Sequence, residues 1–102
     1  MQSQVVGVLN DLGVTINRIS TTGERSAFDI ETDFFMVEIE TGLKHSMEDL
    51  KDRIGNTNLR VIIIVTNKEL MGRYMGLGEH VIVSTVDSFK ILLEEPQKNR
   101  GL

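Results

Sequence analysis

The sequence predicts an α/β domain with a mixed central sheet of about five strands flanked by helices. Short apolar segments alternate along the chain with longer segments whose apolar residues recur every three or four positions. The first three expected strands follow one another through short connections, which favours antiparallel pairing. The later strands are separated by helices, which favours parallel pairing through right-handed crossovers.

The first half of the chain contains one expected helix and three expected strands. Residues 3–12 carry apolar residues on one helical stripe, and Gly13 is a helix stop. Residues 14–20 are expected to be extended. Residues 26–31 and 34–40 are expected to form a hairpin that turns at Thr32 and Asp33.

The second half alternates helices with strands. Helix-capping patterns begin at Ser46, Thr66 and Ser84, and each precedes apolar residues at helical spacing. Residues 60–66 contain five consecutive Val or Ile residues, which indicates a central strand buried on both faces. Residues 80–84 read as a short strand. Pro96 is expected to end the last helix, which gives one domain over residues 1–95 and a flexible tail over 96–102.

The composition narrows the class of protein. A chain of 102 residues without cysteine has room for one domain, excludes disulfides and thiolate metal sites, and suits a cytoplasmic location. The longest apolar run, residues 61–65, is too short to span a membrane. The net charge of −4 argues against a general nucleic-acid coat protein. The acids are clustered, however, because residues 24–40 hold six acids and one base.

The most informative stretch is DIETDFFMVEIETG, residues 29–42. Glu38 and Glu40 are two residues apart on an expected strand, so both point to the same face, roughly 6.6 Å apart along it. Asp29 lies on the other arm of the expected hairpin. Facing carboxylates repel unless a cation or a proton lies between them. We therefore expect Asp29, Glu38 and Glu40 to converge around one divalent metal ion.

Simpler interpretations exist for several of these residues. An acidic strand end is often only a solvated surface, and Lys44 reads as a surface residue at the start of a helix. His45 and His80 lack partners at zinc-ligand spacing. Tyr74 reads either as a partly buried helix residue or as a platform for a nucleic-acid base.

The order of elements, with these acids in these places, resembles the PD-(D/E)XK nuclease superfamily, which has the restriction-endonuclease-like fold. The resemblance extends from the first helix to the last strand and is strongest to compact Holliday-junction-resolvase-like and small archaeal or viral members. It implies that Asp29 and Glu38 are the first and second acids of the motif. These two side chains, with the backbone carbonyl of Ile39, would then bind Mg²⁺ or Mn²⁺.

The chain departs from the family pattern at a few positions. Phe28 stands where the family has proline, and Glu40 stands where it has lysine. Lys44 is a candidate for a migrated lysine and for a charge stabiliser. Compact resolvases carry a metal-supporting Glu on the first helix, where this chain has Gln2 and Gln4.

The resemblance implies a metal-dependent DNA endonuclease that hydrolyses phosphodiester bonds, with Asp29, Glu38, Glu40 and Lys44 as its catalytic residues. Branched or single-stranded DNA is the expected substrate of a structure-selective enzyme, and a homodimer is expected, with Met71, Tyr74 and Met75 as contact residues. The alternative is a non-catalytic adaptor or scaffold with the same fold, which the missing lysine and the acidic balance favour. A third interpretation, a small α/β regulatory domain without metal, requires a different strand order.

Overall fold

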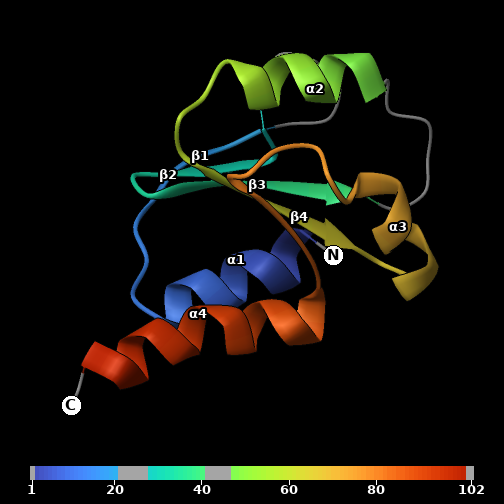
Figure 1. The fold of residues 1–102 in the computed structure, drawn as a ribbon. Helices are drawn as coiled ribbons and strands as arrows, with labels where there is room; N and C mark the ends of the chain where they lie inside the picture. The colour runs from blue at the N-terminus through green and yellow to red at the C-terminus, as the bar shows by residue number, and fades with distance from the viewer. Residues whose placement is uncertain (1, 21–27, 41–46, 101–102) are drawn as a thin grey trace.

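The computed structural model of the protein describes residues 2–20, 28–40 and 47–100, and their side chains as far as residue 93. A five-stranded sheet lies at the centre, with helices on both of its faces (Figure 1). The strands are β1 (Ile16–Ile19), β2 (Ile30–Thr32), β3 (Phe35–Glu40), β4 (Arg60–Val65) and β5 (Val81–Thr85). The helices are α1 (Gln2–Asp11), α2 (Met47–Gly55), the 3₁₀ helix η1 (Lys68–Leu70), α3 (Met71–Tyr74) and α4 (Val86–Arg100). The predicted fold class is confirmed.

The strands lie in the order β1-β2-β3-β4-β5. β1 pairs with β2, and β2 with β3, in antiparallel orientation. β3, β4 and β5 run parallel to one another, as expected for strands joined through helices. The acidic strand β3 and the central strand β4 are therefore connected by the crossover helix α2.

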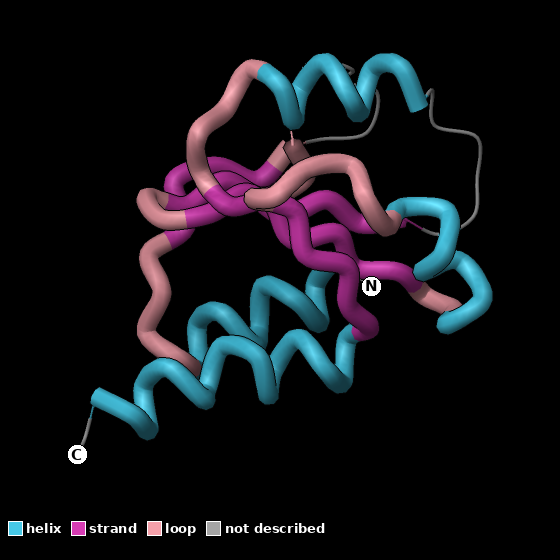
Figure 2. The backbone as a smooth tube through the Cα atoms, in the orientation of Figure 1, coloured by secondary structure: helices cyan, strands magenta, loops and turns pink. Residues whose placement is uncertain are grey.

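Two apolar cores lie on opposite faces of this sheet. α1 and α4 cover one face, and α2 covers the other (Figures 1 and 2). The core beneath α1 and α4 contains Ile62 and Ile64 of β4, whereas the core beneath α2 contains Val61, Ile63 and Val65. β4 is thus buried on both faces, as its run of Val and Ile residues predicts.

Some element boundaries differ from the expectations. α4 continues to Arg100, so the prediction that Pro96 ends this helix is wrong. A proline ring fixes φ near −65°, which is a helical value, and the helix loses one backbone hydrogen bond at that position. The expected third helix is divided into η1 and a single α-helical turn, α3. Among the described residues no helix is long and apolar enough to cross a membrane.

Candidate functional site

The alternation of side chains along β3 separates an apolar face from an acidic face. Phe35, Val37 and Ile39 belong to the core beneath α1 and α4, as expected. Glu38 and Glu40 point to the opposite face, where they are 3% and 0% exposed. These carboxyls are therefore enclosed by the protein and do not form a solvated strand end.

Asp29 joins Glu38 from the neighbouring arm of the hairpin. Asp29 directly precedes β2. Ile30 pairs with Val37, so the same antiparallel register, extended by one residue, places Asp29 opposite Glu38. One carboxylate oxygen of Asp29, Oδ2, accepts a hydrogen bond of 2.7 Å from the backbone N–H of Ile39. The side chains of Asp29 and Glu38 are also hydrogen-bonded to each other. The hairpin therefore brings the two acids of the predicted motif into contact.

The backbone around Asp29 is fixed by two further contacts. The backbone N–H of Ser20 donates to the Asp29 carbonyl at 2.9 Å. The amide Nε2 of Gln2 on α1 lies 3.3 Å from the same carbonyl oxygen. Gln2 thus holds the segment that positions Asp29.

The environment of Glu38 favours its protonated form. The pKa of the Glu38 carboxyl is raised to about 8, first by burial and then by the hydrogen bond and negative charge of Asp29. The positive charge of Arg53 acts in the opposite direction, while Glu40 adds to the increase. At neutral pH the Glu38 carboxyl therefore retains its proton.

Arg53 of α2 is a member of the site that the sequence does not reveal. Its guanidinium donates a charged hydrogen bond to Glu38 Oε2, and the two side chains are only 10% and 4% exposed. The same guanidinium lies over the Phe28 ring, 5.6 Å from the ring centroid. The sequence holds one indication that Arg53 faces the sheet, which is its position. It lies three residues after Leu50 and next to Ile54, on the buried side of an amphipathic helix.

Tyr74 of α3 belongs to the same face. Its hydroxyl donates to Glu40 Oε2 at 3.2 Å, and its side chain is 4% exposed. Burial raises the pKa of the Tyr74 hydroxyl, and the charge of Glu40 raises it further. Tyr74 was expected to be a partly buried helix residue, and it is buried on α3 within its own chain, so it offers little surface for the predicted dimer contact.

The other predicted site residues are only partly tested. Glu40 shares a face with Glu38 and raises its pKa, but its carboxylate is engaged by Tyr74. Within residues 2–20, 28–40 and 47–100, no group of three or more His, Cys, Asp or Glu side chains is arranged to hold a metal ion. A site formed by all three acids thus stays a prediction. Lys44 lies outside the described residues.

Comparison of the chain with protein-family models, with curated proteins and with solved structures gives no match.

Proposed function

We propose that this protein is a metal-dependent nuclease that hydrolyses phosphodiester bonds in DNA. The observation that carries the proposal is the contact between the carboxyls of Asp29 and Glu38 beside the backbone of Ile39. A proton held on the buried carboxyl of Glu38, beside the carboxyl of Asp29, marks a place where a cation can substitute for that proton. The parallel pairing of β3 with β4 through α2 also supports it, because the nuclease interpretation requires that connection.

The donor atoms at this place suit a hard divalent cation. Mg²⁺ prefers oxygen ligands, and it often uses one or two carboxylates and retains several waters. Asp29 and Glu38 supply two carboxylates. The N–H and C=O of one residue in a strand face the same neighbouring strand, so the Ile39 carbonyl faces the segment that carries Asp29. Mg²⁺ or Mn²⁺ would be held by these three groups.

The three acidic residues have different roles in the proposed reaction. Asp29 and Glu38 hold the cation, and Asp29, which is only partly buried, provides the side that is open to solvent. A divalent cation, when bound there, lowers the pKa of a coordinated water and offsets the charge that develops on the phosphate. Glu40 is 0% exposed, so we assign it electrostatic support of Glu38 in place of its predicted contact with the attacking water.

A cleavage assay tests this proposal. Wild-type protein with Mg²⁺ or Mn²⁺ should cut DNA, with branched and single-stranded forms cut in preference to duplex. Glu38→Gln should abolish cutting, because it removes a metal-binding charge and preserves side-chain size. Glu69→Gln is the matched control, since Glu69 is an exposed acid on η1. A wild-type protein that cuts none of these DNA forms with either metal contradicts the proposal.

One observation favours the alternative, a non-catalytic adaptor or scaffold. The guanidinium of Arg53 already provides Glu38 with a positive partner, so the acid is compensated without a metal ion. In this alternative Arg53 and Glu38 fasten α2 to the sheet, and replacing both residues by apolar ones of similar volume preserves the fold and every binding activity. Loss of DNA cleavage in that double variant would favour the nuclease.

A further inference from the structure

The sheet has an open edge at β1, and a groove lies between this edge and α1. The groove has a volume of about 380 Å³. It is lined by two residues of α1 and by the whole of β1: Val6, Asn10, Ile16, Asn17, Arg18 and Ile19. Within the part of the chain that the structure describes, β2 is the one strand that pairs with β1. An unpaired strand edge is a template for the backbone of another strand.

One extra residue in β1, Asn17, gives the groove its apolar side. Side chains three residues apart on a regular strand point to opposite faces. The step from Ile16 to Arg18 on β1 corresponds to a single step on β2, so this rule does not hold here. Ile16 packs against the core beneath α1 and α4, and Ile19 pairs with Ile30 of that core. Both isoleucines therefore face α1, and Ile19 stays 47% exposed.

The backbone of Ile19 supplies hydrogen-bonding groups at the open edge. The N–H of Ser20 donates to the Asp29 carbonyl at 2.9 Å, so the backbone groups of Ser20 face the β2 side. In an antiparallel pair, alternate residues point these groups toward the partner strand and the residues between them point away. The N–H and C=O of Ile19 therefore lie on the open side of β1. An added strand uses such a donor and acceptor pair.

The charge at this edge is positive. Among the described residues that line the groove, Arg18 is the one with a charge. Arg18 is exposed and lies on the opposite face of the sheet from its neighbour Ile19. An added strand would place one side chain beside Ile19 in the groove and the next beside Arg18. The first position favours an apolar side chain and the second favours a carboxylate.

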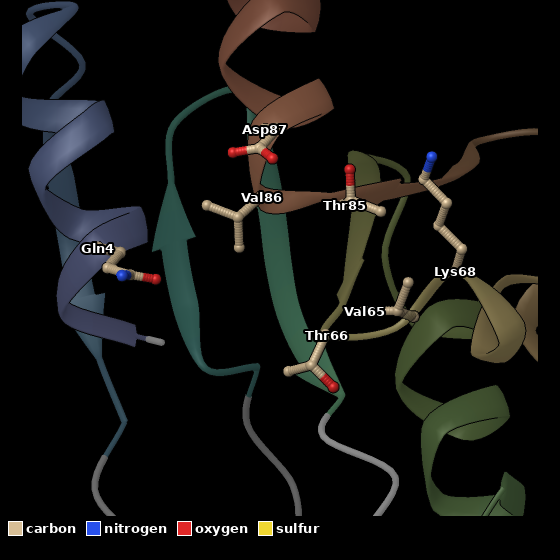
Figure 3. Close-up of a pocket in the computed structure, with 7 residues that line it drawn as sticks. All are labelled: Gln4, Val65, Thr66, Lys68, Thr85, Val86 and Asp87. Carbon is tan, nitrogen blue, oxygen red and sulfur yellow. The ribbon is translucent and has the colours of Figure 1, made fainter.

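A second pocket, also of about 380 Å³, provides a comparison. Figure 3 shows that its side chains come from α1, from the ends of β4 and β5 and from the start of α4. It contains both Lys68 and Asp87, whose opposite charges give no preference for a ligand of one sign. None of the described residues that line it belongs to β1. Lys68, which is exposed, is therefore a matched control for Arg18.

We propose that the groove binds an extended segment of a partner protein, in which apolar and acidic residues alternate, as a strand added to β1. The N–H and C=O of Ile19 bond to the backbone of this segment. One of its apolar side chains packs among Val6, Ile16 and Ile19, and a neighbouring carboxylate pairs with Arg18. The groove lies on the α1 face of the sheet and Glu38 on the other, so the interaction does not depend on the proposed nuclease function.

An amide NMR titration of the intact protein with a short capped peptide of alternating valine and glutamate tests the proposal. The peptide should shift the resonances of Val6, Arg18 and Ile19, and it should slow hydrogen exchange of the Ile19 amide. A peptide of the same composition with its glutamates contiguous should bind about tenfold more weakly, because it cannot place both side-chain types correctly. Absence of binding, or equal binding of the two peptides, would overturn the proposal.

Substitutions then locate the contacts. Ile19→Pro removes a donor that faces away from β2, so the fold should persist while peptide binding is lost. Arg18→Glu should weaken binding of the valine–glutamate peptide about tenfold and favour a valine–lysine peptide, whereas Lys68→Glu should change neither affinity. Equal effects of Arg18→Glu and Lys68→Glu would overturn the proposal. Shifts of β1 resonances that depend on protein concentration without peptide would also overturn it, because the groove would then hold a second copy of the chain.

Discussion

The carboxyl of Glu38 lies between a second carboxyl, that of Asp29, and the guanidinium of Arg53. Burial and the negative charge of Asp29 favour a protonated Glu38, whereas Arg53 favours an ionised one. The resulting pKa of about 8 makes the charge of this site sensitive to pH in the neutral range. Proton binding and folding are therefore coupled at one side chain, and the proposed metal binding would be coupled to both.

The first prediction is that protein stability falls as the pH rises from about 4.5 to about 8. Glu38 has a pKa of 4.5 as a model group and about 8 in the folded protein, so the folded state binds more protons between these values. The contribution of Glu38 is fully present below pH 4.5 and is lost as the pH rises through 8. Its slope reaches about 1.4 kcal/mol per pH unit.

Urea denaturation at several pH values measures this slope. Glu38→Gln should flatten it, because glutamine does not titrate, whereas Glu69→Gln at an exposed position should not. Identical pH profiles for wild type and Glu38→Gln would show that Glu38 does not hold the proton.

The second prediction concerns Tyr74, which donates a hydrogen bond to the buried Glu40. Tyr74→Phe should lower the free energy of unfolding by about 1–3 kcal/mol, because Glu40 loses a buried donor. Tyr74 is the only tyrosine and the chain has no tryptophan, so an absorbance titration at alkaline pH reports this hydroxyl alone. Its ionisation should occur above the ordinary pKa of tyrosine. An unshifted titration would contradict the buried contact.

The sequence predicted part of this site. The positions of Asp29 and Glu38 were predictable because strand alternation and a short hairpin restrict which side chains can face each other. The position of Arg53 was not predictable, because its contact with Glu38 depends on how the crossover helix α2 packs over the sheet. The burial of Glu40 was missed for the same reason, since it is α3 that places Tyr74 against it.

Helix α2 connects β3 to β4 and carries the positive charge of the site. Leu50 and Ile54 are buried in the core beneath it, which fixes the position of Arg53 between them. The helix therefore has two attachments to the sheet, one apolar and one charged. The charged one is expected to respond to a bound cation.

The third prediction is that Arg53→Met lowers the free energy of unfolding by about 1.5–3 kcal/mol in the absence of metal, because a charged hydrogen bond to a buried acid is lost. Saturating Mn²⁺ should reduce this loss, since the cation takes over the compensation of Asp29 and Glu38. Lys51→Met, at an exposed position on the same helix, is the control. An equal loss for Arg53→Met with and without Mn²⁺ would argue that no metal binds beside it.

Most of the elements were predictable from local patterns. Strand β4 and the hairpin follow from short apolar runs, and α1 and α2 follow from helical periodicity. The continuation of α4 beyond Pro96 was not predictable. Proline is generally disfavoured inside a helix, so the local sequence indicates a helix end, although some helices tolerate a proline. The segment expected to form a single helix is divided into η1 and α3, and Asn67 caps η1 by accepting a hydrogen bond from the N–H of Glu69.

The strands lie in the order β1-β2-β3-β4-β5, and the third interpretation from the sequence, a small α/β regulatory domain without metal, stays a prediction. The order and direction of the strands follow from the lengths of the connections, which explains why the whole fold was more predictable than the site. The sheet ends in an open edge at β1, where Ile19 is 47% exposed. Met75 and Ile91 are also exposed large apolar side chains.

The fourth prediction is a homodimer at micromolar concentration. A chain of 11.5 kDa offers little surface with which to hold two DNA strands, so a second copy is expected to complete the binding surface. Light scattering should give about twice the chain mass. Of the three contact residues first considered, Met75 is the one with a largely exposed side chain, at 63%. Met75→Asp should shift the equilibrium toward monomer, and wild-type protein that is monomeric throughout would contradict the prediction.

The most direct test of the metal site is a calorimetric titration of the wild-type protein with Mn²⁺ near pH 7, in two buffers of different ionisation enthalpy. We predict a single site whose binding releases close to one proton, because Glu38 holds a proton at this pH that the cation must displace. Glu38→Gln should eliminate the binding, and Glu69→Gln should leave both the affinity and the proton release unchanged. Absence of binding to the wild type, or equal binding to Glu38→Gln, would contradict a metal site at Asp29 and Glu38.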